Sequence, residues 1–136
     1  GPIETGDAAG HLGVAHALIG HLRAFGFHAA RGQLFLPRSV FTANGVDEKE
    51  IFAGIVSEGL LAARQQLAEM AAEHLSKFEE AVRDLPRPVR RAFGPCAVLR
   101  MQLRALEARG DAVFEAPRES ADWRKIAALA FWAMRA

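Results

Sequence analysis

The sequence contains no Asp or Glu between residues 8 and 46, although the whole chain carries 16 of them. Cys96 is its only cysteine, which excludes an internal disulfide and a cysteine-based zinc site and is typical of a reducing compartment. No apolar run approaches the roughly 20 residues that span a bilayer, and the first residues lack the pattern of a signal peptide. The formal net charge of +1 gives no overall attraction to nucleic acid. These absences predict a cytoplasmic protein that does not bind nucleic acid.

Helical periodicity is the main pattern that is present. The 136 residues suffice for one core, and 51% of them are hydrophobic. Apolar residues recur at three- and four-residue steps in the first segment, which Thr5 or Asp7 could cap and which Arg31-Gly32 ends. No segment shows the alternation of a strand. We therefore predict an all-α helical bundle of about five helices, with residues 1–136 forming a single domain.

The longest predicted helix covers residues 51–85 and would extend roughly 50 Å. Asp47 and Glu50 have the spacing of a capping box at its start. Another helix is expected at residues 89–108, where Gly94-Pro95 predicts a kink or a late start. The middle of the chain is therefore expected to form long helices that are interrupted at glycine and proline.

The last predicted helix, capped by Ser120 or Asp122, is apolar on nearly every side and includes Ile126, Leu129, Phe131, Trp132 and Met134. A helix that is apolar all round must be surrounded by other structure. Trp123 and Trp132 are nine residues apart and project from opposite sides, so that one would be buried while the other meets a partner. We therefore expect a fragment of a larger fold, or a chain that assembles with itself or with another protein.

Residues 13–37, GVAHALIGHLRAFGFHAARGQLFLP, combine a helical segment, an arginine-glycine loop and an apolar turn. This stretch resembles the second aspartate-rich segment of the squalene and phytoene synthases. In that family the segment has the form Ala-x-Gln-x-x-Asn-x-x-Arg-Asp-x-x-x-Asp, followed by a basic residue, Gly, and Tyr-Leu-Pro or Phe-Leu-Pro. Matching residues occur without a gap at Ala15, Arg23, Arg31-Gly32 and Phe35-Leu36-Pro37. The resemblance extends over residues ~10–135 and implies the C-terminal half of an isoprenoid (squalene/phytoene) synthase-like fold, with the N-terminal half absent.

Four positions depart from the family pattern. Ala17 replaces the Gln, Gly20 replaces the Asn, and Ala24 and His28 replace the two Asp. In the family, two Asp four residues apart share a helical face and hold Mg²⁺, which binds the substrate diphosphate. The resemblance therefore implies that the second metal cluster is lost, so we expect no catalytic residue and no metal ligand here. Mg²⁺ is expected only if the missing N-terminal half supplies its ligands.

The candidate ligand-binding residues are Arg23, His28, Arg31 and Phe35. Guanidinium groups can bind a diphosphate or an anionic lipid headgroup without metal, whereas the alternative is that Arg23 and Arg31 pair with distant carboxylates such as Glu58. Neither these arginines nor Arg38 has a carboxylate close in the sequence.

Histidines do not provide a metal site in this reading. On a continuous helix His21 and His28 would lie about 10 Å apart along the axis, too far to share one zinc ion. His28 is therefore expected to contact an anion or to have a structural role.

Three functions stay open. The resemblance is greatest to the branch of the family that includes a complex I assembly factor, which implies a non-catalytic protein that binds a partner or an isoprenoid-diphosphate-like ligand. Alternatively, the protein is an active prenyltransferase that condenses farnesyl or geranylgeranyl diphosphate, or a helical scaffold without a ligand. The expected partners are the N-terminal half of the fold, a second copy or another protein.

The arginine cluster Arg87, Arg90 and Arg91 allows two interpretations. It could contact an anionic membrane surface, or it could be the solvated start of a helix. The first interpretation implies a peripheral location at the inner membrane, and the second leaves the protein in the cytoplasm.

Overall fold

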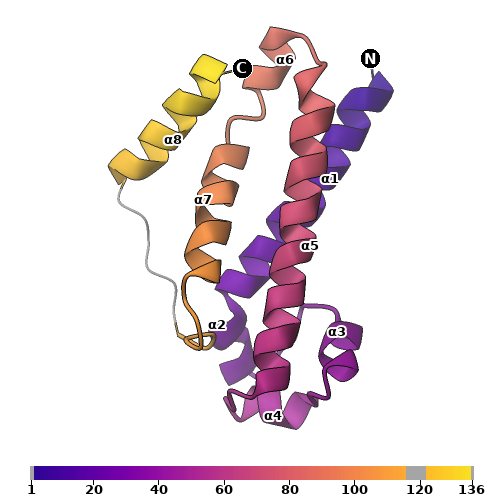
Figure 1. Cartoon of the computed structure of the whole chain (residues 1–136), viewed down its shortest axis with the longest axis vertical. Helices are drawn as coiled ribbons and strands as arrows, with labels where there is room; N and C mark the ends of the chain where they lie inside the picture. The colour runs from indigo at the N-terminus through magenta and orange to yellow at the C-terminus, as the bar shows by residue number, and fades with distance from the viewer. Residues whose placement is uncertain (1, 116–121, 136) are drawn as a thin grey trace.

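The structure is a computed structural model that describes residues 2–115 and 122–135. Within these residues all regular structure is helical, which confirms the predicted all-α class. The helices are α1 (Pro2–Arg23), α2 (Phe25–Ala30), α3 (Arg38–Ala43), α4 (Glu48–Phe52), α5 (Glu58–Arg83), α6 (Arg87–Arg91), α7 (Cys96–Glu107) and α8 (Asp122–Arg135). Figure 1 shows α1 and α5 side by side along the long axis, α2 to α4 at one end, and α8 at the edge beyond α7.

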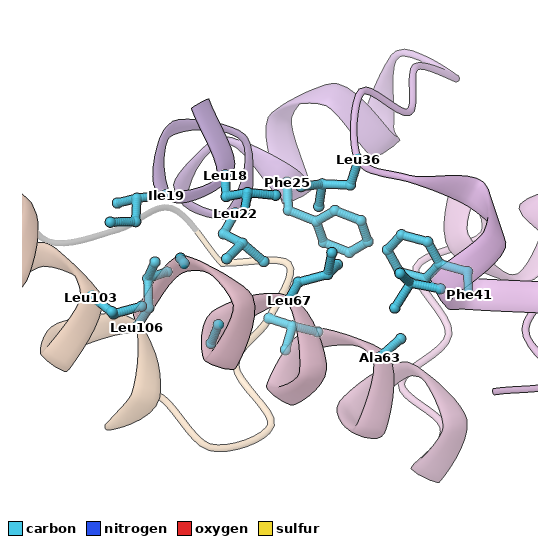
Figure 2. Close-up of a cluster of buried hydrophobic side chains, with 14 of the residues drawn as sticks. Leu18, Ile19, Leu22, Phe25, Leu36, Phe41, Ala63, Leu67, Leu103 and Leu106 are labelled. Carbon is cyan, nitrogen blue, oxygen red and sulfur yellow. The ribbon is translucent and has the colours of Figure 1, made fainter. Parts of the chain in front are cut away.

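The core forms where α1 and α5 pack against each other. On α1 the buried residues Ala15, Leu18, Ile19 and Leu22 recur at three- and four-residue steps, so they line one side of the helix. The facing side of α5 alternates large and small residues, Leu60, Ala63, Leu67, Ala68, Ala71 and Leu75. Figure 2 shows Leu103 and Leu106 of α7, which belong to the same cluster. The alanines allow the two long helices to approach closely.

A second apolar cluster lies farther along α5, toward α6 and α8. Phe78 is fully buried there, with Val82, Leu85 and Cys96, and Trp132 of α8 packs against it. The Phe78 and Trp132 ring centroids are 6.2 Å apart. Helix α8 is held in place by this cluster and by its contacts with α7.

The prediction of one continuous helix over residues 51–85 is wrong. α4 ends at Phe52, Gly54 adopts a left-handed conformation with φ 71°, and α5 begins only at Glu58. The hydroxyl of Ser57 accepts a hydrogen bond from the backbone N–H of Leu60 and so caps α5. A glycine with positive φ followed by a capping serine ends one helix and starts another.

The capping box at Asp47 and Glu50 is confirmed. The backbone N–H of Glu50 donates to Asp47 Oδ1 at 3.0 Å, and the backbone N–H of Asp47 donates to Glu50 Oε2 at 3.2 Å. It opens the short helix α4, not the long helix for which it was predicted.

The first helix also differs from the prediction. α1 begins at Pro2, so neither Thr5 nor Asp7 caps it; proline is favoured in a first turn because its missing N–H would have no partner there. The helical segment is interrupted at Ala24 and continues as α2. Its predicted end at Arg31-Gly32 is confirmed, because Gly32 has φ 65° and no helix continues beyond it.

The segment at Gly94-Pro95 separates α6 from α7, as the predicted late start required. Gly94 is buried, and a Cβ atom there would lie 3.3 Å from Cδ1 of Trp132. Trp132 is half-buried whereas Trp123 is exposed, in agreement with their predicted opposite projection. Of the two predicted caps of the last helix, Ser120 lies outside the described residues and Asp122 is the first residue of α8.

Candidate functional site

The four positions that the resemblance predicts to be altered from the family pattern follow the outward side of α1 and continue onto α2. Ala17 and Gly20 are exposed, and Ala24 and His28 are half-buried. A Cβ atom added at Gly20 would meet no atom within 4 Å. This side faces away from the core, because Leu18 and Leu22 on the opposite side pack against α5. We call it the α1 open side: Ala17, Gly20, Ala24 and His28.

Three rings gather at the end of the α1 open side. Phe35, from the loop after α2, stacks on His21 with centroids 5.4 Å apart and meets the edge of His28 at 4.6 Å. The two imidazole rings are themselves 5.8 Å apart. The predicted separation of about 10 Å concerned the positions along the helix axis; the two side chains reach toward each other, and both rings contact Phe35. The structure thus brings together two of the predicted ligand-binding residues, His28 and Phe35.

Arg31 lies beside this ring cluster on the surface. Its guanidinium carbon is 3.6 Å from the centroid of the Phe27 ring, and its Nη1 donates to the backbone carbonyl of Phe27 at 3.4 Å. Phe27 in turn meets the edge of His28 at 5.7 Å. Both Arg31 and Phe27 are exposed, so the guanidinium is accessible to an anion from solvent.

Arg38, by contrast, forms an ion pair with Glu48 of α4. Although it has no carboxylate close in the sequence, the turn between α3 and α4 brings one within reach. Arg38 is therefore a surface ion-pair residue and does not join the ring cluster.

Arg23 is half-buried at the end of α1, close enough to Arg109 to affect its pKa. Sequence reasoning missed Arg109 and its neighbour Arg64. The pKa of Arg109 is lowered, mainly by burial of its side chain. The Glu115 carboxylate opposes this shift, and the positive charges of Arg64 and Arg23 add to it. Arg64 Nη1 donates to the carbonyl of Leu106 at 2.7 Å, and Arg109 Nη2 donates to that of Ala112 at 2.8 Å. These bonds hold the segment after α7 against the core.

Few features of the sequence indicate this arginine group. Arg64 is a polar residue next to the buried Ala63 in an apolar segment, which is a weak indication, and Arg109 lies in a loop. Their side chains border a small internal cavity of about 10 Å³, which also contacts Leu22, Phe25 and Phe41. Such a volume holds about one water molecule. The group therefore tightens the fold and offers no room for a prenyl chain.

The residues present do not fit a Mg²⁺ ion on the α1 open side. Mg²⁺ requires oxygen ligands in octahedral geometry, whereas Ala24 offers none and His28 offers only imidazole nitrogen. Among residues 2–115 and 122–135, no group of three or more His, Cys, Asp or Glu is placed to hold a metal ion. The arrangement on this side can bind an anion through guanidinium groups and apolar matter through aromatic rings.

Comparison with known proteins identifies the class. The model of the squalene/phytoene synthase family matches residues 2–127, so this chain belongs to that family. It is 26% identical over 136 residues to a 15-cis-phytoene synthase of Synechococcus elongatus, across 99% of this chain and 44% of the relative. It is also 28% identical over 91 residues to the mouse NADH dehydrogenase (ubiquinone) complex I assembly factor 6, across 67% of this chain and 27% of the relative. The chain thus spans less than half the length of either relative.

No solved structure matches the chain significantly. Within the described part of the chain, no helix is both long enough and apolar enough to cross a membrane.

Proposed function

We propose that this protein is a non-catalytic member of its family that binds an isoprenoid diphosphate, or a ligand of similar chemistry, without condensing it. The observation that carries the proposal is the pair Ala24 and His28 at the positions that match the second Asp pair of the synthases. A methyl group provides no ligand, and imidazole suits metals other than Mg²⁺. This helix therefore lacks the anchor for a second metal cluster.

In the proposed site, guanidinium groups take over the neutralisation of the phosphates. Arg31 is exposed at the ring cluster, and Arg23 adds positive charge at the end of α1. Charge-assisted hydrogen bonds from arginine to phosphate are strong and need no metal. His28 and the exposed face of Phe35 form the adjoining wall, where Phe35 offers apolar surface to the prenyl chain.

The partner that we propose first is the N-terminal half of the same fold. The chain spans 44% of the length of the cyanobacterial relative, and the α1 open side is exposed over Ala17 and Gly20. The remaining half of the fold, a second copy or another protein would cover this side.

We further propose a role in the assembly of a NADH dehydrogenase complex, as the name of the mouse relative indicates for that protein. For this role we propose a location in the cytoplasm, at the periphery of the inner membrane.

Binding of farnesyl diphosphate to the full-length protein in the presence of EDTA tests the proposed function. We expect binding without metal, measured by isothermal titration calorimetry. Arg31→Ala should weaken it about tenfold or more, because a hydrogen bond to a charged group contributes roughly 1.5–3 kcal/mol. Arg38→Ala is the matched control, since Arg38 pairs with Glu48. No binding in EDTA, or equal affinities of wild type and Arg31→Ala, contradicts the proposal.

A second function is favoured by the 26% identity to a phytoene synthase across nearly the whole chain. In this alternative the protein is an active prenyltransferase, and the N-terminal half supplies all the Mg²⁺ ligands. An Asp-x-x-x-Asp pair in the upstream sequence would favour this alternative, and an upstream sequence without such a pair would exclude it.

A further inference from the structure

The outward side of α8 is a continuous apolar surface. Trp123 and Ile126 are each 66% exposed, Phe131 is 57% exposed and Met134 is 75% exposed. With the exposed Ala127, Ala130 and Ala133, these residues occupy an arc of about 160° around the helix axis at 100° per residue. We call this surface the α8 apolar face: Trp123, Ile126, Ala127, Ala130, Phe131, Ala133 and Met134.

The opposite side of α8 already has its packing partners. Trp132 packs against Phe78, and both Trp132 and Leu129 lie close to Gly94. Figure 1 shows α8 at the edge of the bundle, with α7 between it and the long helices. The α8 apolar face is therefore not the side by which the helix docks on its own chain.

Positive charge borders the α8 apolar face. Arg124 and Arg135 follow it directly around the helix, and their guanidinium carbons are each 5.4 Å from the ring centroids of Trp123 and Phe131 respectively. Next to them a groove of about 780 Å³ separates α8 from α5 and α7. Its lining includes Arg83, Arg90, Arg100, Arg104 and Arg135, against two carboxylates, Glu79 and Glu107.

Charge is also distributed unevenly along the whole sequence. Residues 83–136 contain eleven Lys and Arg and six Asp and Glu, a net charge of +5. Residues 1–82 contain six Lys and Arg and ten Asp and Glu, a net charge of −4. The segment that carries α8 is therefore strongly cationic although the chain is nearly neutral, and it attracts an anionic surface.

We propose that the α8 apolar face inserts into the surface of an anionic membrane, with the helix axis parallel to the bilayer. A 14-residue helix is about 21 Å long, too short to span the hydrocarbon core of ~30 Å. Aromatic and aliphatic residues next to arginines are the composition of helices that lie in the membrane interface. Arg124, Arg135 and the groove arginines other than Arg100, which forms an ion pair with Glu79 at 3.0 Å, then face the lipid phosphates.

Charge decides between a membrane and a second copy of the chain. A symmetric dimer through α8 would place the same cationic segment of both copies against each other, and like charges at an interface oppose association. An anionic lipid surface is complementary to both the apolar residues and the arginines. The inference goes beyond the proposed function, because it holds whether or not the α1 open side binds a ligand, and it assigns a surface to the proposed peripheral location.

Vesicle co-sedimentation of the full-length protein tests this inference. We expect binding to vesicles that contain phosphatidylglycerol, weaker binding to phosphatidylcholine alone, and a loss of binding at high salt. Ile126→Asp with Met134→Asp should reduce the vesicle-bound fraction at least about tenfold, because each side chain loses its favourable burial. Ile55→Asp is the matched control, since Ile55 is a similarly exposed apolar residue that lies before α5.

Tryptophan fluorescence provides a second readout that needs no destabilising substitution. Brominated lipids should quench the wild-type emission on binding, and Trp123→Phe should remove most of that quenching while leaving Trp132 in place. Three results would overturn the inference. The first is no binding of the full-length protein to anionic vesicles, which is the result expected if the N-terminal half of the fold covers the α8 apolar face. The second is an equal loss of binding in the Ile55→Asp control, and the third is wild-type dimerisation that protects Trp123 in the absence of lipid.

Discussion

Two exposed sides of this molecule differ in kind. The α1 open side consists of Ala17, Gly20 and the half-buried Ala24 and His28, which offer little apolar area and no carboxylate. The α8 apolar face consists of large side chains bordered by arginine. The first is the side on which we propose that the metal-binding side chains of the family have been replaced, whereas the second consists of exposed apolar residues whose burial would be favourable. The α1 open side therefore carries the family resemblance, whereas the α8 apolar face has the stronger tendency to associate with another surface.

The largest expected effect on stability concerns Phe78, which packs against α8 and does not contact the α1 open side. Phe78→Ala should cost about 3–5 kcal/mol in the free energy of unfolding, because a fully buried ring leaves a cavity beside Trp132. Urea denaturation followed by circular dichroism measures the loss. Phe27→Ala, at an exposed ring, is the control and should cost far less. Equal losses in the two variants would show that the Phe78 cluster does not support the fold.

Two glycines in the first helices differ in the space around them: Gly26 is crowded and Gly20 is open. A Cβ atom at Gly26 would lie 1.9 Å from the backbone oxygen of Phe114, so Gly26→Ala should destabilise by roughly 1–3 kcal/mol. Gly20→Ala, on the α1 open side, meets no atom within 4 Å and should stabilise by up to about 1 kcal/mol through helix propensity. Thermal denaturation of both variants measures the difference. A destabilised Gly20→Ala would mean that this side is closely covered in the full-length protein.

Introducing two carboxylates at the positions of Ala24 and His28 would sharpen the interpretation of the α1 open side. Ala24→Asp with His28→Asp recreates two acidic residues four positions apart. We expect Mg²⁺ to strengthen farnesyl diphosphate binding by about tenfold in this double variant and to have no effect on the wild type. Calorimetric titration with and without Mg²⁺ measures both. An equal Mg²⁺ effect in the two proteins would show that the metal site, if present, does not use these positions.

The smallest expected effect concerns Cys96, in the cluster that supports α8. Burial, followed by the Glu79 carboxylate, raises the pKa of its thiol to about 12 from an ordinary value near 9.0, while Arg100 opposes the shift. The thiol is neutral in both states below pH 8, so it adds no pH dependence there. Above the unfolded pKa, deprotonation favours the unfolded chain, and stability should fall by up to about 1.4 kcal/mol per pH unit.

Cys96→Ala should lack this part of the alkaline loss, when unfolding free energies are compared between pH 8 and pH 10. The native thiol should also react slowly with an alkylating reagent at pH 8, because the thiolate is the reactive form. Fast alkylation of the folded protein would contradict the buried position of the side chain.

Local sequence patterns predicted much of the fold because they concern neighbouring residues. The capping box at Asp47 and Glu50 and the stop at Arg31-Gly32 depend on contacts within a few positions, and both are confirmed. The break before α5 was missed although Gly54 and Ser57 are visible in the sequence, because the apolar spacing continues across it. Periodicity records which side is buried and does not show where the helix axis changes direction.

The candidate site was predictable only in part. His28 and Phe35 were candidates because of the family resemblance of the segment, and the structure brings their rings together; their role as ligand-binding residues stays a prediction. Arg64 and Arg109 were missed because their proximity to Arg23 depends on how α5 and α7 pack, and the Glu48 partner of Arg38 depends on the turn between α3 and α4. Pairings between distant segments arise from tertiary packing, which local spacing does not encode.

The central claim is that this family member has lost the chemistry of the synthases at Ala24 and His28. The most direct measurement incubates the full-length protein with farnesyl or geranylgeranyl diphosphate and Mg²⁺, and analyses both the hydrocarbon products and the released diphosphate. The account predicts binding without any condensed product and without diphosphate release above background. Mg²⁺-dependent formation of a head-to-head condensation product would contradict it.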